Sequence, residues 1–212
     1  MTVWASFYDH ILPELNGITP GVVDHMLRQV CIDFCEQTCI HTEEVDPINV
    51  VAGTATYTLT SLTADTEPFK IKAAWHDDHP LDIAPVDILN TAYEYWGSTD
   101  GEPRVYTQKQ PDEIILYPNP ETAVTGGLRV ELILRPTQTA AGLTTWIAER
   151  YMQCLAYGVK GRFMMQPNRP WTNPEHGMYY LRMYNASRSS AAIEANNSLT
   201  RASLSARPRP AA

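Results

Sequence analysis

The sequence predicts an α+β protein in which helices from both ends of the chain form a bundle and an antiparallel β domain is inserted between them. Three observations support this prediction. Apolar residues recur at helical spacing near both ends, they alternate with polar residues between Pro47 and Pro136, and the last residues contain few large apolar side chains. Since each helical part has one apolar face, the two parts are expected to pack on each other.

These patterns divide the chain into three parts. We predict a helical bundle from residues 1–46 and 137–199, an inserted β-rich domain over residues 47–136, and a flexible basic C-terminal arm over residues 200–212. A chain of 212 residues is long enough to bury one core together with a smaller second one.

The N-terminal part is expected to begin with a short amphipathic helix. Trp4, Phe7 and Ile11 lie at helical spacing before a proline that ends the pattern. A second helix is predicted from Thr19-Pro20 to about His41, because threonine at the N-cap and proline in the first turn are typical of a helix start. The apolar face of this helix contains Val23, Leu27, Val30, Cys31 and Phe34.

Alternation of apolar and polar residues predicts strands over most of residues 47–136. Residue pairs that favour turns separate these strands. The pairs are Ala52-Gly53, Asp77-Asp78, Pro111-Asp112 and Gly126-Gly127. The buried faces of two strands are expected to contain Phe69, Ile71, Ala73 and Trp75, and Leu128, Val130, Leu132 and Leu134. One helix is predicted among the strands, near Pro85 to Tyr95.

Helical spacing returns after Leu143 and is interrupted once, at a corner that contains prolines. Gly158 and Gly161 in the first of these two helices are small enough to allow close approach of other helices. Asn173 can cap the second helix, with Pro174 in its first turn. One continuous helix through the corner is excluded by Pro167, Pro170 and Pro174.

The net charge of −8 combines an acidic body with a basic end. Residues 1–181 contain 11 Lys and Arg against 23 Asp and Glu, whereas residues 182–212 contain five Arg against one Glu. The sequence has no long uncharged apolar run, and its first residues lack the basic and then apolar order of a signal peptide. We therefore expect no membrane partner and synthesis in the cytoplasm.

No motif predicts an enzyme, a metal site or a cofactor site. Cys31, Cys35 and Cys39, followed by His41, are residue types that bind zinc. Residues four apart on a helix are nevertheless spread along its axis, over roughly 12 Å for three of them, so we expect reduced thiols in the core. The HDDH sequence of residues 76–79 is expected to form a polar hairpin turn. No glycine-rich phosphate loop, G-x-S-x-G or H-E-x-x-H sequence occurs.

Two groups of residues near the C-terminus have more than one interpretation. Tyr179, Tyr180 and Tyr184 could stack on nucleic acid bases, but the acidic body favours a role in helix packing. Residues beyond about Ser189 lack the large apolar side chains that would order them in isolation. The arginines of this arm fit either a solvated terminus or a docking segment.

Five motifs follow one another along most of the chain. They are Phe34-Cys35, the hairpin residues Glu44, Asp46, Pro47, Ile48, Val50, Gly53, Tyr57 and Leu59, then Leu116-Pro118-Pro120, Leu132-Leu134-Pro136, and the corner from Met165 to Pro174. In this order they resemble the phage adaptor proteins, the head-to-tail connectors of tailed phages, which include the tail tubular protein A type. Gln166-Pro167-Asn168 departs from the small-residue corner expected of that family.

The resemblance implies a structural, non-enzymatic protein of the virion neck, made in the host cytoplasm. Its bundle would build a homo-oligomeric ring, commonly a dodecamer, between the portal protein and the tail nozzle or tail tube protein. Double-stranded DNA would pass through the ring during ejection without specific binding, and Trp171 would hold the two C-terminal helices together. Expected site residues are Arg201, Arg207 and Arg209 in a portal-docking arm, and Pro170, Trp171, Asn173 and Pro174 in helix-corner packing.

Two other functions remain open at the level of sequence. A surface-binding β module that recognises carbohydrate or a receptor would need exposed aromatic residues on the β segment. The available ones are Trp75, Tyr93, Tyr95 and Trp96. A tail-associated envelope hydrolase is the third alternative, although no residues can be nominated for its catalysis.

Overall fold

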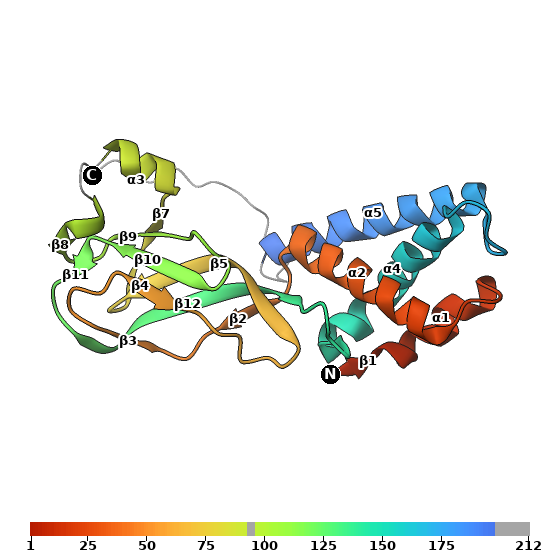
Figure 1. The fold of residues 1–212 in the computed structure, drawn as a ribbon, viewed down its shortest axis with the longest axis horizontal. Helices are drawn as coiled ribbons and strands as arrows, with labels where there is room; N and C mark the ends of the chain where they lie inside the picture. Colours follow the sequence, from red (N-terminus) through yellow and green to blue (C-terminus); the bar gives the residue numbers. More distant parts are fainter. Residues whose placement is uncertain (93–95, 198–212) are drawn as a thin grey trace. The chain divides into compact units, whose positions relative to one another are not determined.

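A computed structural model describes residues 1–92 and 96–197 of the chain (Figure 1). Two compact units divide the chain: Met1–Ile40 with the residues from Thr144 onward form a helical unit, and His41–Leu143 form a β unit. Long helices and antiparallel sheets thus occupy separate units. The predicted α+β fold class is confirmed.

Three long helices make up most of the helical unit. They are α2 (Pro20–Thr38), α4 (Thr145–Met164) and α5 (Pro174–Asn196). The short elements before them are β1 (Thr2–Val3), the 3-10 helix η1 (Trp4–Phe7), α1 (Tyr8–Ile11) and the 3-10 helix η2 (Leu12–Glu14). The last three of these elements follow one another without a gap, so the predicted opening helix is present as a helical run of mixed 3-10 and α type. The side chains of Trp4, Phe7 and Ile11 are buried.

Helix α2 begins where it was predicted to begin, but it ends earlier. Thr19 occupies the N-cap position before Pro20, but its side chain makes no capping hydrogen bond. At the other end, Cys39 adopts a left-handed conformation with φ of 52°, which ends the helix at Thr38 instead of near His41.

Two glycines allow the long helices to pack closely, as predicted. A Cβ atom on Gly158 would lie 2.8 Å from Cγ1 of Val30 in α2 and 3.0 Å from the ring of Tyr184 in α5. A Cβ atom on Gly161 would lie 2.8 Å from the side chain of Leu181 in α5. The helical unit therefore depends on glycine where α4 meets its two neighbours (Figure 1).

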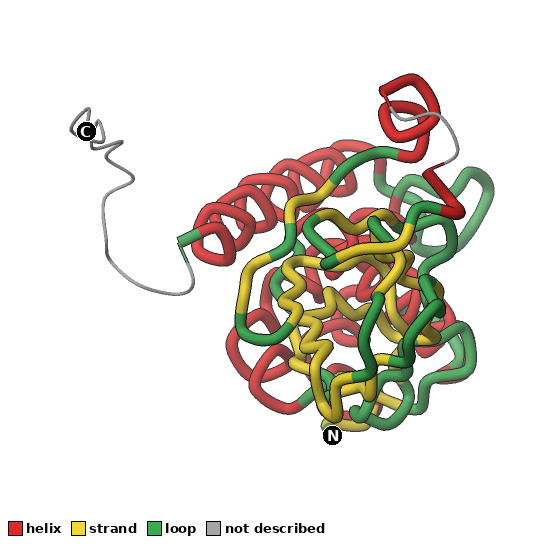
Figure 2. Tube along the Cα trace, turned by 90° about the vertical axis from the view of Figure 1, so that its left-hand side faces the viewer, coloured by secondary structure: helices red, strands yellow, loops and turns green. Residues whose placement is uncertain are grey.

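The β unit contains short strands around two long ones (Figure 2). Its strands are β2 (Thr42–Glu44), β3 (Ile48–Val50), β4 (Thr56–Thr58), β5 (Thr66–His76), β6 (His79–Pro80), β7 (Asp82–Ile83), β8 (Asp100–Gly101), β9 (Val105–Thr107), β10 (Glu113–Tyr117), β11 (Asn119–Pro120), β12 (Val124–Pro136) and β13 (Gly142–Leu143). Its helices are α3 (Val86–Ala92) and the 3-10 helix η3 (Trp96–Ser98). Strands β2 and β13 lie outside the predicted range of 47–136, because neither carries a run of alternating apolar residues. The last three residues of the helix predicted near Pro85 to Tyr95 lie outside the described residues.

Two main sheets share one core. The first sheet has the order β2-β12-β5-β6, with β3 also paired to β12, and the second has the order β4-β10-β9-β7. Among strands β2 to β12, the ladders are antiparallel except those of β7 with β9 and β8 with β11. Apolar side chains from both sheets form the core, including Leu128, Val130, Leu132 and Leu134 of β12, which are buried as predicted, with Tyr57, Tyr106, Ile114 and Leu116.

Two irregularities change the predicted strand faces. Opposite β12, the pairing of β5 skips one residue at Lys72 and another at Phe69, so the alternation shifts within the strand. Ile71 and Ala74 are consequently buried, whereas Ala73 and Trp75 are only half-buried, which corrects the predicted face.

Of the predicted turns, the one at Asp77-Asp78 is confirmed and the one at Gly126-Gly127 is wrong. Asp77 and Asp78 both have positive φ and form the tight turn between β5 and β6, as expected for the HDDH sequence. Gly126-Gly127 does not separate strands as predicted. It lies within β12, where Gly126 has a φ of 64° and the register with β3 shifts.

Candidate docking surfaces

The corner between α4 and α5 is fixed by its own hydrogen bonds. The backbone N–H of Asn173 donates to the carbonyl of Met164 at 3.0 Å, and the Asn173 side chain accepts from the N–H of His176 at 3.2 Å. Pro174 is the first residue of α5, where its missing N–H costs no helical hydrogen bond. These local contacts end one helix and start the next within nine residues, 165 to 173.

Trp171 lies half-buried at this corner, beside the exposed Pro170. Its ring meets the ring of Phe163 edge to face, with 6.2 Å between centroids, and its Nε1–H donates to Oε1 of Gln166 at 3.4 Å. Trp171 therefore packs on the end of α4 and on the corner itself.

Below the corner lies a hollow of about 380 Å³. It is lined by Glu14, Met164, Pro170, Trp171, Thr172, Asn173, His176 and Tyr180. Two of the polar residues that line it, Glu14 and Tyr180, contact Lys160. We call these three residues the Lys160 cluster. The Nζ of Lys160 lies 2.8 Å from Oε1 of Glu14 and 4.4 Å from the centre of the Tyr180 ring, and Tyr180 donates a hydrogen bond to Glu14.

Lys160 is only 3% exposed, so its ammonium group depends on this carboxylate. Burial alone would raise the pKa of Glu14, but the hydrogen bonds from Lys160 and Tyr180 outweigh it and lower the pKa below its ordinary value. The same hydrogen bond to Glu14 raises the pKa of Tyr180 to about 12. The cluster thus joins η2, α4 and α5 through one ionised carboxylate.

A second polar cluster joins the long helices. In this Asp33 cluster, Oδ2 of Asp33 accepts from Nη2 of Arg162 at 3.1 Å, from Nη1 of Arg188 at 3.1 Å and from the hydroxyl of Tyr184 at 2.8 Å. Burial, and then the charge of Asp33, raise the pKa of Tyr184 well above its ordinary range. Neither cluster was predicted from the sequence. The available signal was a charged residue within an otherwise apolar helical face, as Lys160 between Gly158 and Gly161 shows.

The three tyrosines considered as a stacking platform have separate environments. Tyr184 is buried in the Asp33 cluster, Tyr180 stacks on Tyr157 at 5.6 Å, and Tyr179 is exposed. Their arrangement agrees with helix packing for two of the three. Arg201, Arg207 and Arg209 of the predicted arm lie outside the described residues.

The aromatic residues of the β unit also have intramolecular contacts. The guanidinium of Arg129 lies 5.3 Å from the ring centre of Trp75 and bonds to Asp78 at 3.0 Å. Trp96 meets Tyr117 edge to face at 6.3 Å, and its Nε1–H donates to Asn90 at 2.6 Å. Tyr93 and Tyr95 lie outside the described residues.

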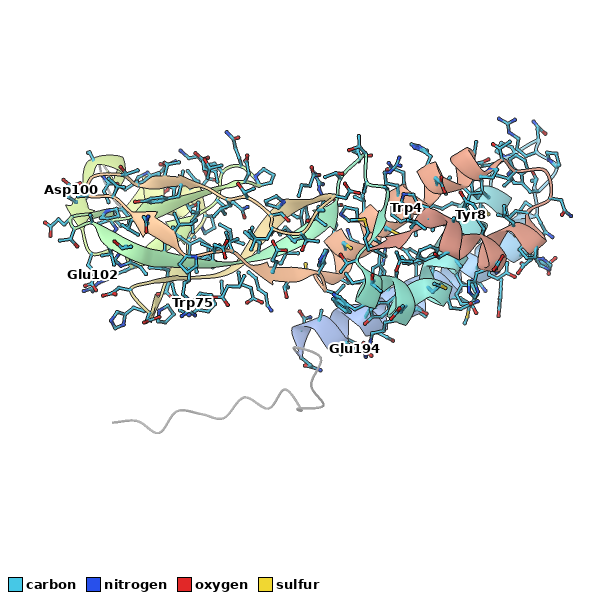
Figure 3. The ribbon with its side chains drawn as sticks, turned by 90° about the horizontal axis from the view of Figure 1, so that it is seen from below. Trp4, Tyr8, Trp75, Asp100, Glu102 and Glu194 are labelled. Atoms are coloured by element: carbon cyan, nitrogen blue, oxygen red, sulfur yellow. The ribbon has the colours of Figure 1, made fainter. Side chains whose placement is uncertain are left out.

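Most of the negative charge of the protein belongs to the β unit. Residues 41–143 contain six Lys and Arg against sixteen Asp and Glu, a net charge of −10. The rest of the chain contains ten Lys and Arg against eight Asp and Glu. Asp100 and Glu102 illustrate the acidic character at one end of the unit (Figure 3). The acidic body predicted from the sequence is therefore a property of the β unit.

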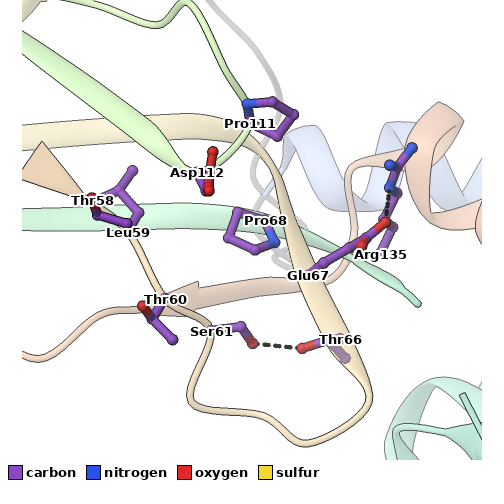
Figure 4. A pocket seen from close by; sticks show the side chains of 10 residues that line it. All are labelled: Thr58, Leu59, Thr60, Ser61, Thr66, Glu67, Pro68, Pro111, Asp112 and Arg135. Atoms are coloured by element: carbon purple, nitrogen blue, oxygen red, sulfur yellow. Dashed lines mark hydrogen bonds and ion pairs between the residues drawn. The ribbon is translucent and has the colours of Figure 1, made fainter. Parts of the chain in front are cut away.

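Two hollows lie along strand β5 of this unit. The first, of about 460 Å³, is lined by Thr58, Leu59, Thr60, Ser61, Thr66, Glu67, Pro68, Pro111, Asp112 and Arg135 (Figure 4). The second, of about 320 Å³, is lined by Lys70, Ile71, Ile83, Ala84, Pro85, Thr107 and Gln108. Hydroxyl and carboxylate groups dominate the first, whereas aliphatic side chains dominate the second.

The cysteines have the environment of core residues. Cys31, Cys35 and Cys154 are buried and Cys39 is half-buried. Burial raises the pKa of Cys35 to about 12 and that of Cys154 to about 11, so neither thiol is reactive at neutral pH. Within the described part of the chain, no group of three His, Cys, Asp or Glu residues could hold a metal ion. No described helix is both long and apolar enough to cross a bilayer.

The model of the SU10 adaptor protein family matches residues 12–209, which include most of both units. A search of curated proteins finds no significant match.

Proposed function

Because the chain belongs to the SU10 adaptor protein family, a family of structural phage proteins, we propose that it forms an adaptor ring between the portal and the tail. Membership of the family makes the protein a virion component that contacts other head and tail proteins. The finer assignment, to a homo-oligomeric ring of the tail tubular protein A type, with twelve copies, is part of the proposal.

The charge of the β unit is the observation that supports a DNA channel. A surface with a net charge of −10 repels phosphate groups, so double-stranded DNA slides past it without adhering. The β unit therefore suits the wall of a passage used during DNA ejection. The same charge keeps subunits soluble before assembly.

The helical unit supplies the rigid part of the proposed ring. The Asp33 and Lys160 clusters hold its helices together, and the corner at Pro170–Pro174 fixes the start of α5 without help from another chain. A subunit that keeps one shape can repeat around a closed ring. We place the portal contact in the arm that contains Arg201, Arg207 and Arg209, and the contact with the tail nozzle or tail tube protein elsewhere on the ring.

The alternatives have less support. A carbohydrate-binding or receptor-binding β module needs aromatic faces open to solvent, whereas Trp75 and Trp96 are engaged by Arg129 and Tyr117. The adaptor family is structural, and no arrangement of described residues nominates a nucleophile with its base for a hydrolase.

Electron microscopy and mass measurement of the purified protein, alone and mixed with a portal ring, test the proposal. We expect ring-shaped particles with central openings, attached coaxially to the portal. Subunits that remain monomeric and unattached in the presence of the portal would contradict it. A peptidoglycan-clearing assay on the same preparation separates the adaptor from a hydrolase.

A further inference from the structure

Strand β5 is paired along its whole length on one side only. It pairs with β12 from Thr66 to His76, whereas on the other side β6 pairs with Trp75 and His76 alone. No strand within residues 1–92 and 96–197 pairs with residues 66–73 on that other side. Strand edges of this kind bind extended peptides through main-chain hydrogen bonds.

A side chain from the other sheet contacts this edge. Gln108 directly follows β9, and its Oε1 accepts from the N–H of Ile71 at 3.1 Å. Its Nε2 donates to the carbonyl of Pro111 at 2.9 Å. The N–H of Ile71 is thus bonded to a side-chain oxygen where a neighbouring strand would offer a main-chain carbonyl. An incoming strand can replace this oxygen without breaking any strand pairing.

The two hollows beside β5 follow each other along this edge, and together we name them the β5 groove. Residues 66–68 of β5 line the larger hollow, and residues 70–71 line the smaller one. The connection between β9 and β10 contributes to both, since residues 107–108 line the smaller hollow and residues 111–112 the larger. The groove therefore lies between β5 and this connection.

One end of the β5 groove exposes aliphatic side chains. Ile83 is 67% exposed, and it lines the smaller hollow together with the exposed Pro85 and the buried Ile71. Neighbouring exposed aliphatic residues are typical of a contact site. This end therefore suits an aliphatic side chain of a partner.

The other end of the β5 groove carries one unpaired charge. Asp112 lines the larger hollow, and its carboxylate has no hydrogen bond or ion pair with the part of the chain that the structure describes (Figure 4). The two cations that line the groove have partners. Arg135 bonds to Glu67 at 2.8 Å. The Nζ of Lys70 lies 4.7 Å from the ring centre of Phe69. Asp112 is therefore available to a cation of a partner.

The spacing of the two ends follows from the pairing of β5. Pro68 and Ile71 lie opposite residues 134 and 132 of β12, because the pairing skips Phe69. The two β5 residues therefore face the same side, about 7 Å apart, as alternate residues of a regular strand do. A regular strand added beside them would present one side chain to each hollow from positions two residues apart.

We propose that the β5 groove binds an extended segment of a partner protein as an added strand. The segment has an aliphatic residue at the smaller hollow and Lys or Arg two residues away, beside Asp112. The net charge of −10 on the β unit attracts such a basic segment. Because the adaptor family contacts other head and tail proteins, the segment belongs to one of those proteins. Ring formation is not required for this contact.

A peptide library tests the proposal on the full-length protein. The probe is a display library of random twelve-residue peptides, selected on the immobilised protein. We expect the enriched peptides to share an aliphatic residue and Lys or Arg two positions apart. A saturating selected peptide should slow hydrogen exchange of the Ile71 amide and its neighbours within residues 66–73 by about tenfold or more. A selection that yields no peptide protecting these residues would overturn the proposal.

Alternate N-methylation of a selected peptide distinguishes an added strand from binding by side chains alone. Methyl groups on one set of alternating amides remove the donors that face β5, so this peptide should bind about tenfold more weakly or worse. Methyl groups on the other set face away from β5 and should change affinity by less than about threefold. Fluorescence anisotropy measures both affinities. Equal affinities of the two methylated peptides would contradict strand pairing and overturn the proposal.

Two substitutions locate the contact. Ile83→Lys and Asp112→Lys should each weaken binding of the unmethylated peptide about tenfold or more, because each places a repelling cation in the groove. The main-chain hydrogen bond from the N–H of Leu59 to the carbonyl of Asp112, at 2.7 Å, does not depend on the side chain that is replaced.

Matched controls change the same residue types outside the groove. Val51→Lys replaces an aliphatic side chain that is 53% exposed, and Asp46→Lys replaces an exposed carboxylate of the same unit. Both should leave binding within about twofold, because neither lines the groove. Equal weakening by the control and groove variants would show only general charge attraction, and would also overturn the proposal.

Discussion

At the scale of single residues, two charges inside the helical unit have the largest structural consequences. Asp33 accepts three hydrogen bonds from two other helices, and Lys160 is buried against Glu14. Removing one member of such a group leaves the buried charges and polar atoms of its partners unpaired. The resulting loss in the free energy of unfolding exceeds what the intact interaction contributes. Both residues therefore constrain how the helices pack.

Asp33→Ala tests the first cluster. We expect a loss of about 2 to 3 kcal/mol in the free energy of unfolding, because two guanidinium groups lose this carboxylate and the Tyr184 hydroxyl keeps only its longer bond to the Val30 carbonyl, at 3.4 Å. Urea denaturation followed by circular dichroism at the helical band measures it. Glu149→Ala, an exposed carboxylate on α4, is the control and should change stability by less than about 0.5 kcal/mol. Equal effects of the two variants would contradict the role of Asp33.

Trp171→Ala tests the corner. Because the side chain is half-buried and contacts Phe163, the expected cost is about 2 kcal/mol, below that of a fully buried tryptophan. Thermal unfolding measures the change. A melting temperature equal to that of the wild type would show that the ring contributes nothing to the subunit, and would assign it to a partner surface.

At the scale of elements, close helix packing and one ionised carboxylate determine the helical unit. Helix α4 approaches α2 and α5 only because glycine occupies positions 158 and 161. The Lys160 cluster then joins η2 to α4 and α5. The close packing predicts that added side-chain volume at these glycines lowers the stability of the protein. The ionised carboxylate predicts that stability depends on pH.

Gly158→Ala should destabilise the protein by about 1 to 2 kcal/mol, although alanine is the better helix former by about 1 kcal/mol. The added methyl group would lie 2.8 Å from Val30, so the helices must separate. Gly21→Ala is the matched control, because its Cβ would meet no atom within 4 Å. Denaturant midpoints of the two variants should move in opposite directions, and a shared direction would contradict the packing argument.

The lowered pKa of Glu14 predicts acid sensitivity of the helical unit. A carboxyl group whose pKa is lower in the folded state stabilises the fold above its unfolded pKa, and this contribution is lost as pH falls through the folded value. Stability should therefore decline as pH falls below about 4.5. Glu14→Gln should lower stability at pH 7 and flatten the decline at acid pH, as measured by urea denaturation across pH. An unchanged pH profile would contradict the assignment.

At the scale of the whole molecule, charge is divided between parts of the chain. The β unit is strongly acidic, whereas residues 198–212 contain only basic charges. The acidic charge of the β unit would repel DNA phosphates. Assembly and DNA passage would then use different surfaces of one subunit.

The arm supplies the prediction at this scale. Neutralising Arg201, Arg207 and Arg209 should weaken portal binding and make it less dependent on salt, while the melting temperature of the subunit stays within about 1 °C. Sedimentation of mixtures with a portal ring at two salt concentrations measures this. Portal binding at wild-type strength after deletion of residues 200–212 would contradict a role of this arm in portal docking. The arginines would then belong to a solvated terminus.

The sequence by itself determined the features that depend on neighbouring residues. Helical spacing identified α2, α4 and α5, alternation identified β12 and its buried leucines, and Asn173-Pro174 marked the start of α5, because these patterns are local consequences of backbone geometry. The adaptor family was also recognisable from motifs in their order along the chain.

Only the tertiary structure decided which residues meet across the chain. The skipped residues Phe69 and Lys72 depend on the pairing of β5 with β12, and the burial of Lys160 depends on Glu14, far away in sequence. Such contacts follow from long-range packing and charge compensation, which leave no periodic signal in the sequence.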